Sequence, residues 1–146
     1  MEPEHLNLLR LFEEEKVDYL IIGGYAVIAH GYPRFTNDLN LLIQASRENG
    51  LRAVRALERF GRPVGEFEAD DFVRIPSFIS FATDKAWFDL MTQIPGIDAD
   101  ASFARFTLLT TQGLALKFMD LASLRANKQA TGRTKDLLDL ENLPST

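Results

Sequence analysis

The sequence contains no cysteine, which excludes disulfide bonds, thiolate nucleophiles and cysteine-ligated zinc sites. Its 146 residues also lack internal repeats, low-complexity tracts and any linker rich in proline, glycine or serine. The apolar stretch 19–29 is too short, and too interrupted by glycine, to span a bilayer. We therefore expect one domain, residues 1–146, in a soluble, cytoplasmic protein that does not bind membranes.

Positive charge is also scarce: the chain has 16 Lys and Arg residues against 21 Asp and Glu residues, a formal net charge of −5. A protein with this balance lacks the overall basic surface that drives broad adhesion to nucleic acid. The composition still allows a local basic patch. Hydrophobic residues make up 46% of the chain, which is enough for the core of an ordinary globular domain.

Hydrophobic periodicity and helix end signals predict five helices. The first carries Leu6, Leu9 and Phe12 at helical spacing. Ser46 is a candidate N-cap for the third helix, in which Leu51, Val54 and Leu57 share a face. We expect the first helix between residues 3 and 13, the second at residues 25–30 and the third between residues 46 and 61. The last two are expected at residues 123–130 and 134–143.

Runs of strand-type residues predict a sheet with strands at 19–22, 38–43, 78–81, 86–91, 106–110 and 114–118. The last two flank Gln112-Gly113, which is typical of a hairpin. Because strands outnumber helical crossovers, we expect a mixed, mostly antiparallel central sheet flanked by helices, an α/β (α+β) fold. Trp87 and Phe88 are expected to face the core.

A glycine pair, Gly23-Gly24, lies between the first predicted strand and the following helix. Without side chains there, backbone N–H groups can approach phosphate oxygens, and the helix N-terminus adds positive potential. The alternative is that the two glycines only permit a tight turn between strand and helix.

Acidic and amide side chains point to a metal site. Asp38 and Asn40 are two residues apart in a predicted strand, so they share one face while Leu39 points into the core. Asp89 is a lone acid in an apolar strand, where an unpaired charge is costly, although an exposed sheet face would also tolerate it. Because Mg²⁺ prefers hard oxygen ligands, we predict that Asp38, Asn40 and Asp89 bind Mg²⁺ or Mn²⁺ and form the catalytic centre.

The chain resembles the minimal nucleotidyltransferases of the DNA polymerase beta-like superfamily, near the abortive-infection toxin branch. The family pattern is Gly-Gly or Gly-Ser after a strand, then Arg-x-Thr-x-Asp-x-Asp, then an Asp on a later strand. The resemblance covers about residues 18–143, and segment 127–141 resembles a C-terminal signature of these proteins. The matching residues are Gly23, Gly24, Arg34, Thr36, Asp38 and Asp89, whereas Asn40 replaces the second acid of the motif.

The resemblance implies a nucleotidyltransferase fold and transfer of a nucleoside monophosphate from a nucleoside triphosphate to a hydroxyl of RNA, such as tRNA, or of protein. It also implies a toxin–antitoxin pair with a cognate antitoxin or other partner protein. Asp38 and Asp89 would hold magnesium. The residues that the resemblance implies would bind the nucleotide are Gly23, Gly24, Arg34, Thr36, Lys128, Arg133 and Lys135. For the basic residues of 128–135, the alternative is a solvated helix surface paired with nearby acids.

Asn40 is the departure from the family pattern that bears most on activity. Two unit charges about 4 Å apart at an effective dielectric near 20 interact by about 4 kcal/mol, and a divalent ion doubles this. Even half of that energy corresponds to roughly three powers of ten in rate or metal affinity. The sequence is compatible with a weakened enzyme, with a catalytically inactive module that binds a nucleotide or a partner, and with a substitution introduced into an active enzyme.

Overall fold

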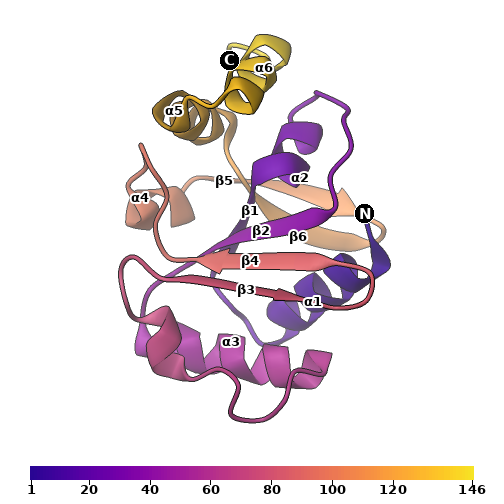
Figure 1. The fold of residues 1–146 in the computed structure, drawn as a ribbon, viewed down its shortest axis with the longest axis vertical. Helices are drawn as coiled ribbons and strands as arrows, with labels where there is room; N and C mark the ends of the chain where they lie inside the picture. The colour runs from indigo at the N-terminus through magenta and orange to yellow at the C-terminus, as the bar shows by residue number, and fades with distance from the viewer.

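The computed structural model describes residues 1–146 as one six-stranded sheet with helices on both faces (Figure 1). The helices are α1 (Pro3–Glu14), α2 (Gly23–Ala29), α3 (Arg47–Phe60), α4 (Ala99–Phe103), α5 (Leu121–Thr131) and α6 (Thr134–Asn142), with a short 3-10 helix, η1 (Ala69–Phe72). The strands are β1 (Tyr19–Ile22), β2 (Asp38–Ile43), β3 (Phe78–Ala82), β4 (Trp87–Met91), β5 (Phe106–Thr111) and β6 (Leu114–Met119). No helix has the length and apolar character needed to cross a membrane.

The strand order is β3-β4-β2-β1-β6-β5, so β3 and β5 form the two edges of the sheet. The β1–β2, β3–β4 and β5–β6 pairs are antiparallel, whereas β1–β6 and β2–β4 are parallel. This pairing confirms the predicted mixed, mostly antiparallel sheet. The parallel β2–β4 pair is the one that positions the candidate site, because it joins the two strands that carry Asp38 and Asp89.

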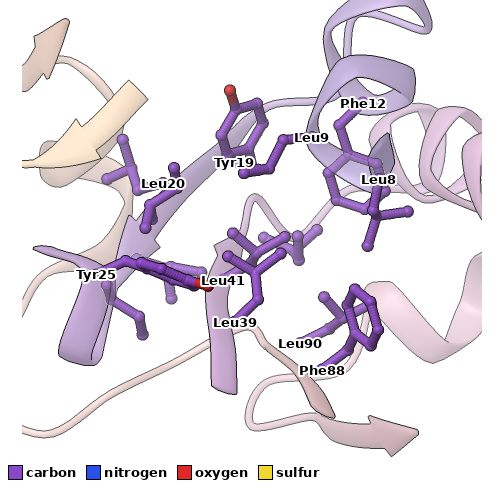
Figure 2. Packing of buried hydrophobic residues seen from close by; sticks show 14 of the residues in the cluster. Leu8, Leu9, Phe12, Tyr19, Leu20, Tyr25, Leu39, Leu41, Phe88 and Leu90 are labelled. Carbon is purple, nitrogen blue, oxygen red and sulfur yellow. The ribbon is translucent and has the colours of Figure 1, made fainter. Parts of the chain in front are cut away.

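The hydrophobic core is a single cluster of 30 buried residues. On one face of the sheet, Leu8 and Phe12 of α1 pack with Leu39 and Leu41 of β2 (Figure 2). Burying one such side chain contributes about 2 kcal/mol, so the core face of β2 is strongly specified. Because strand side chains alternate, this packing directs the side chains at 38 and 40 to the opposite face.

Several local expectations need correction. Helix α2 begins at Gly23 rather than at residue 25, so the glycine pair forms its first turn. On α3, Leu51 is 44% exposed, and the smaller Ala53 and Ala56 are buried instead. Ser46 does cap α3, because its side chain accepts a hydrogen bond from the Asn49 backbone N–H.

On β4, Phe88 is buried as expected but Trp87 is 54% exposed. Adjacent residues of a strand face opposite sides, so Trp87 shares the open face of the sheet with Asp89. The two elements that the sequence did not predict, α4 and η1, are each no longer than five residues. Such short elements carry too little periodicity to be recognised.

Candidate active site

A cleft of about 340 Å³ opens on the face of the sheet opposite α1 and is bounded on its other side by α5 and α6. Its walls include the glycine turn, the polar residues of β2 and β4, and basic residues near the C-terminus. Of the predicted site residues, those that line it are Gly23, Asp38, Asn40, Asp89, Lys128, Arg133 and Lys135. The tertiary structure therefore brings together segments that are up to about a hundred residues apart.

The acidic wall of the cleft is built by the register of the parallel β2–β4 pair. Asn40 of β2 is the register partner of Asp89 of β4, and Asp38 lies two residues before Asn40 on the same face of β2. All three side chains are half-buried. The Ser80 hydroxyl of β3 donates a hydrogen bond to Asp89 Oδ1 at 2.7 Å, which extends this polar row to the edge of the sheet.

Gly23 has a φ of +67°, a left-handed conformation that favours glycine. A Cβ atom at this position would overlap the side-chain amide of Asn40. The position therefore requires glycine for two independent reasons: its backbone conformation and the close approach of Asn40. Its backbone lines the cleft, as the phosphate-binding hypothesis requires.

Gly24 serves a different purpose. It does not line the cleft, and a Cβ atom there would lie 2.8 Å from Thr36 Cβ and 3.3 Å from Arg34 Nη1. The missing side chain lets segment 34–37 pack onto α2. This contact supports the alternative interpretation, a glycine required by local packing, at the second position of the pair.

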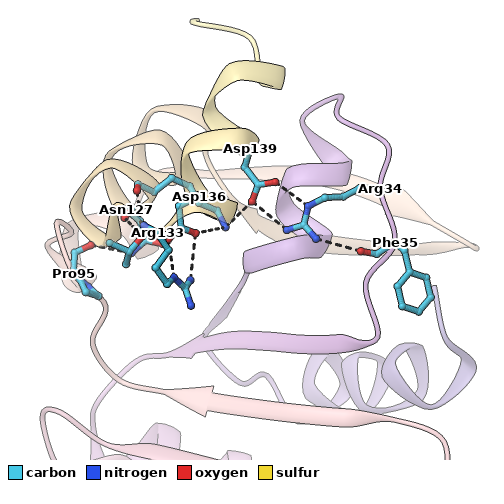
Figure 3. A network of polar contacts seen from close by, with 9 residues as sticks. Arg34, Phe35, Pro95, Asn127, Arg133, Asp136 and Asp139 are labelled. Carbon is cyan, nitrogen blue, oxygen red and sulfur yellow. Dashed lines mark hydrogen bonds and ion pairs between the residues drawn. The ribbon is translucent and has the colours of Figure 1, made fainter.

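Arg34 and Thr36 also lie outside the cleft, in contrast to their expected place at the nucleotide. Arg34 Nε is 2.9 Å from Asp139 Oδ1 of α6, and its side chain is 17% exposed (Figure 3). The Asp38 backbone N–H lies 3.4 Å from Thr36 Oγ1. Both residues thus hold the chain between α2 and β2 in place, and through it they position Asp38.

The opposite wall of the cleft carries a network of ion pairs between α5 and α6 (Figure 3). Lys128 is buried, and its Nζ lies 3.3 Å from Asp136 Oδ1 and 3.0 Å from Asp139 Oδ2. Arg133 Nε lies 2.8 Å from Asp136 Oδ2, although the Arg133 side chain is 68% exposed. The expected ion pairs are therefore present, but at Lys128 they are buried rather than solvated.

Two opposing effects act on the pKa of Asp136. Burial raises it, whereas hydrogen bonds from Arg133 and Thr131 and the charge of Lys128 lower it. The lowering effects prevail, so the pKa of Asp136 lies well below the ordinary value of an aspartate. Asp136 is consequently a charged partner of the basic residues and a poor proton acceptor.

Lys135 differs from the other basic residues of the cleft. It is exposed, and no carboxylate lies within ion-pair distance of it. Its charge is therefore free to meet an anionic ligand, whereas the charge of Lys128 is balanced by two carboxylates. Among the predicted phosphate-binding residues, Lys135 and the exposed Arg133 are the best placed.

The cleft offers oxygen ligands of the kind that a divalent cation prefers. The structure contains no group of three or more His, Cys, Asp or Glu side chains arranged to hold a metal ion. Asp38 and Asp89 nevertheless line one cleft together with the neutral amide of Asn40. Two carboxylates and an amide oxygen fit one hard cation of the Mg²⁺ type, which commonly completes its coordination with water and phosphate oxygens.

Ser80 is the polar neighbour of this site that the sequence did not reveal. It lies in the middle of a correctly predicted strand, but its closeness to Asp89 depends on the β3–β4 register. Hydrophobic alternation predicts that a strand exists and which side chains share a face. It does not identify the residue of another strand that lies opposite each of them.

Several solved structures have a similar fold, and two of them align with nearly the whole of this chain. One is a candidate nucleotidyltransferase from Thermotoga maritima, with a TM-score of 0.62 and 17% identity, covering 97% of this chain and 92% of that chain. The other is the lincosamide antibiotic adenylyltransferase LnuA with lincomycin bound, with a TM-score of 0.57 and 18% identity, covering 99% and 97%. No protein-family model and no curated protein matches the chain. The structural similarity establishes a nucleotidyltransferase fold.

Proposed function

We propose that this chain is a magnesium- or manganese-dependent nucleotidyltransferase. It would transfer a nucleoside monophosphate from a nucleoside triphosphate to a hydroxyl of RNA, such as tRNA, or of a protein, and release pyrophosphate. A role in a toxin–antitoxin pair, with a cognate antitoxin as partner, belongs to the same proposal. The observation that carries it is the presence of Asp38 and Asp89 in one cleft with Lys135 and Arg133 on the facing wall.

The charges of the cleft suit a triphosphate bound with a cation. Asp38 and Asp89 would hold the cation, and Asn40 would add a neutral oxygen. A divalent cation bound there supplies Lewis-acid activation of the phosphate oxygens. Lys135 and Arg133 would neutralise the phosphates farther from the reacting centre.

The same geometry supports a proposal for the proton acceptor. The attacking hydroxyl must lose a proton as it reaches the α-phosphorus, and a carboxylate within hydrogen-bond distance can accept it. Asp89 already accepts a hydrogen bond from a protein hydroxyl at 2.7 Å, so its carboxylate is open to such a donor. Asp38 would then serve mainly as a ligand of the cation.

A thermal-shift screen tests the proposal with little material. Each of the four common nucleoside triphosphates is added with and without magnesium, and a ligand at about 100 times its Kd should stabilise the fold by about 2.7 kcal/mol. Asp38→Asn and Asp89→Asn should abolish the magnesium-dependent shift, whereas Asp84→Asn, at an exposed and unpaired aspartate, should retain it. Absence of a shift with all four nucleotides at millimolar concentration would contradict the proposal.

A second candidate function is a catalytically inactive module that binds a nucleotide or a protein partner through this cleft. The observation that favours it is Asn40, which leaves the cleft with two carboxylates instead of three. Such a module would show the same thermal shift but would label no acceptor. The Asn40→Asp variant separates the two functions.

A further inference from the structure

Ser80 is a hydroxyl placed at the edge of the candidate site. It lies on β3, an edge strand with no strand beyond it, and its side chain is exposed. It is the register partner of Asp89, and its Oγ donates to Asp89 Oδ1 at 2.7 Å. No other hydrogen bond to the Asp89 carboxylate is present, so Oδ2 remains available to a cation.

This arrangement is what an acceptor hydroxyl needs. A nucleophilic oxygen must lie beside the group that takes its proton, and must be close to the reacting phosphorus. Ser80 Oγ meets the first requirement in the resting structure. Ser80 does not itself line the cleft, but its hydroxyl contacts Asp89, which does, so the hydroxyl lies next to the space proposed for the nucleotide.

We propose that Ser80 is a site of self-nucleotidylation, in which the chain transfers a nucleoside monophosphate from a nucleoside triphosphate to its own hydroxyl. This inference rests on the proposed nucleotidyltransferase function and names an acceptor for the same site. Ser80 Oγ attacks the α-phosphorus, so an oxygen–phosphorus bond forms to Ser80. The bond between the α-phosphorus and its bridging oxygen to the β-phosphate breaks, and pyrophosphate leaves with the electron pair. The hydroxyl proton passes to the Asp89 carboxylate and then to water.

The hydroxyl that does line the cleft, that of Thr131, is a weaker candidate. Thr131 lines the cleft, and its Oγ1 donates to Asp136 Oδ2 at 2.7 Å. Asp136 is engaged by Arg133 and Lys128, and its pKa is held low by these partners. Thr131 belongs to α5, on the wall opposite the carboxylates proposed to hold the cation, so its hydroxyl does not lie beside them as that of Ser80 does.

The modification would be intramolecular and would stop at one group per chain. The Ser80 hydroxyl contacts Asp89, which lines the cleft of the same chain, so the reaction needs no encounter between two molecules. A nucleotide joined to Ser80 would lie over Asp89 and block a second nucleoside triphosphate. The half-time of labelling should therefore be independent of protein concentration, and the final stoichiometry should approach one.

Intact-mass spectrometry tests the inference. The parent chain and the Asn40→Asp variant are each incubated with every one of the four nucleoside triphosphates and manganese. We expect a mass gain of one nucleoside monophosphate. Trypsin releases peptide 75–85, in which fragmentation distinguishes Ser80 from Ser77 and Thr83. Ser80→Ala should lose the modification, Ser80→Thr should keep it, and Ser145→Ala, at an exposed serine outside the cleft, should leave it unchanged.

Nucleotide-dependent thermal shifts measured on the same variants give a second readout. Ser80→Ala should retain the shift, because it removes the acceptor and leaves the ligands of the cation. Transfer to added RNA or protein without modification of Ser80 would overturn the inference and leave the proposed function standing. Labelling that persists in Ser80→Ala, or labelling that slows in proportion to dilution, would also overturn it. No labelling and no thermal shift would overturn both.

Discussion

Gly23 and Asn40 are packed so closely that a single Cβ atom at residue 23 would overlap the Asn40 amide. The contact joins the first residue of α2 to the middle of β2, and both residues line the candidate active site. It ties the backbone proposed to bind phosphate to the side chain that replaces the family's second acid. Changes at either position therefore test how the cleft works.

Asn40→Asp should convert a weak or inactive protein into a more active enzyme. A third carboxylate beside Asp38 and Asp89 strengthens cation binding, and we expect transfer of label from an α-labelled nucleoside triphosphate to RNA or protein to rise by roughly 10²- to 10³-fold. When a chelator removes divalent cations, the Asn40→Asp variant should melt at a lower temperature than the parent protein, because three like charges repel one another. An unchanged rate together with an unchanged magnesium-dependent shift would favour the inactive binding module.

Gly23→Ala should destabilise the protein by about 1–3 kcal/mol through backbone strain alone, with an added cost from the overlap with Asn40. Gly113→Ala is the matched control, because Gly113 also has a positive φ but has open space around it. The double variant Gly23→Ala with Asn40→Ala should recover the overlap cost and keep the strain cost. Chemical denaturation of the parent, Gly23→Ala, Asn40→Ala and the double variant measures both contributions, and strict additivity would show that the contact has no energetic weight.

Lys135→Ala should weaken nucleoside triphosphate binding by about 10- to 100-fold, the range expected for one charge-assisted contact. Lys85→Ala is the control, because Lys85 is equally exposed and unpaired but does not line the cleft. Titration calorimetry at two salt concentrations should also show a smaller salt dependence for Lys135→Ala. Equal affinities for the two variants would remove Lys135 from the phosphate site.

Asp136→Asn should destabilise the fold by about 3–5 kcal/mol at neutral pH, because it leaves the buried charge of Lys128 with one carboxylate instead of two. The pKa of Asp136 is lowered in the folded protein, so its stabilising contribution is complete above the unfolded-state pKa of about 3.9 and is lost as the pH falls toward the folded-state pKa. The difference in unfolding free energy between variant and parent should therefore shrink below about pH 4. A difference that is constant from pH 7 to pH 3 would assign the effect to packing.

Arg34→Met should show whether Arg34 stabilises the fold or binds the nucleotide. Its guanidinium pairs with Asp139 and does not line the cleft, and Asp139 keeps Lys128 as a second partner, so we expect a loss of stability of about 1–3 kcal/mol. Nucleotide affinity measured on the folded fraction should change by less than it does in Lys135→Ala. A large loss of affinity at unchanged melting temperature would restore the phosphate-binding role implied by the family resemblance.

Much of the local architecture follows from the sequence. The alternation of Asp38, Leu39, Asn40 and Leu41 determines that the two polar side chains share a face, because strand side chains have a period of two. Short-range rules of this kind located the six strands and the five longer elements among the helices, and they also identified Ser46 as a cap. The expectation that both Trp87 and Phe88 face the core was wrong, because adjacent residues of a strand face opposite sides and Phe88 is the buried one.

The tertiary structure decided which of these local features meet. Arg34 pairs with Asp139, 105 positions away, and Ser80 lies opposite Asp89 only because β3 and β4 adopt one register. Local periodicity depends on backbone geometry within a few residues, whereas registers and distant ion pairs depend on how the whole hydrophobic set is buried at once. The sequence by itself therefore determined the chemical groups and the faces on which they lie. Only packing of the complete chain decided that Lys135 faces the cleft, that Arg34 does not, and that a serine hydroxyl lies beside Asp89.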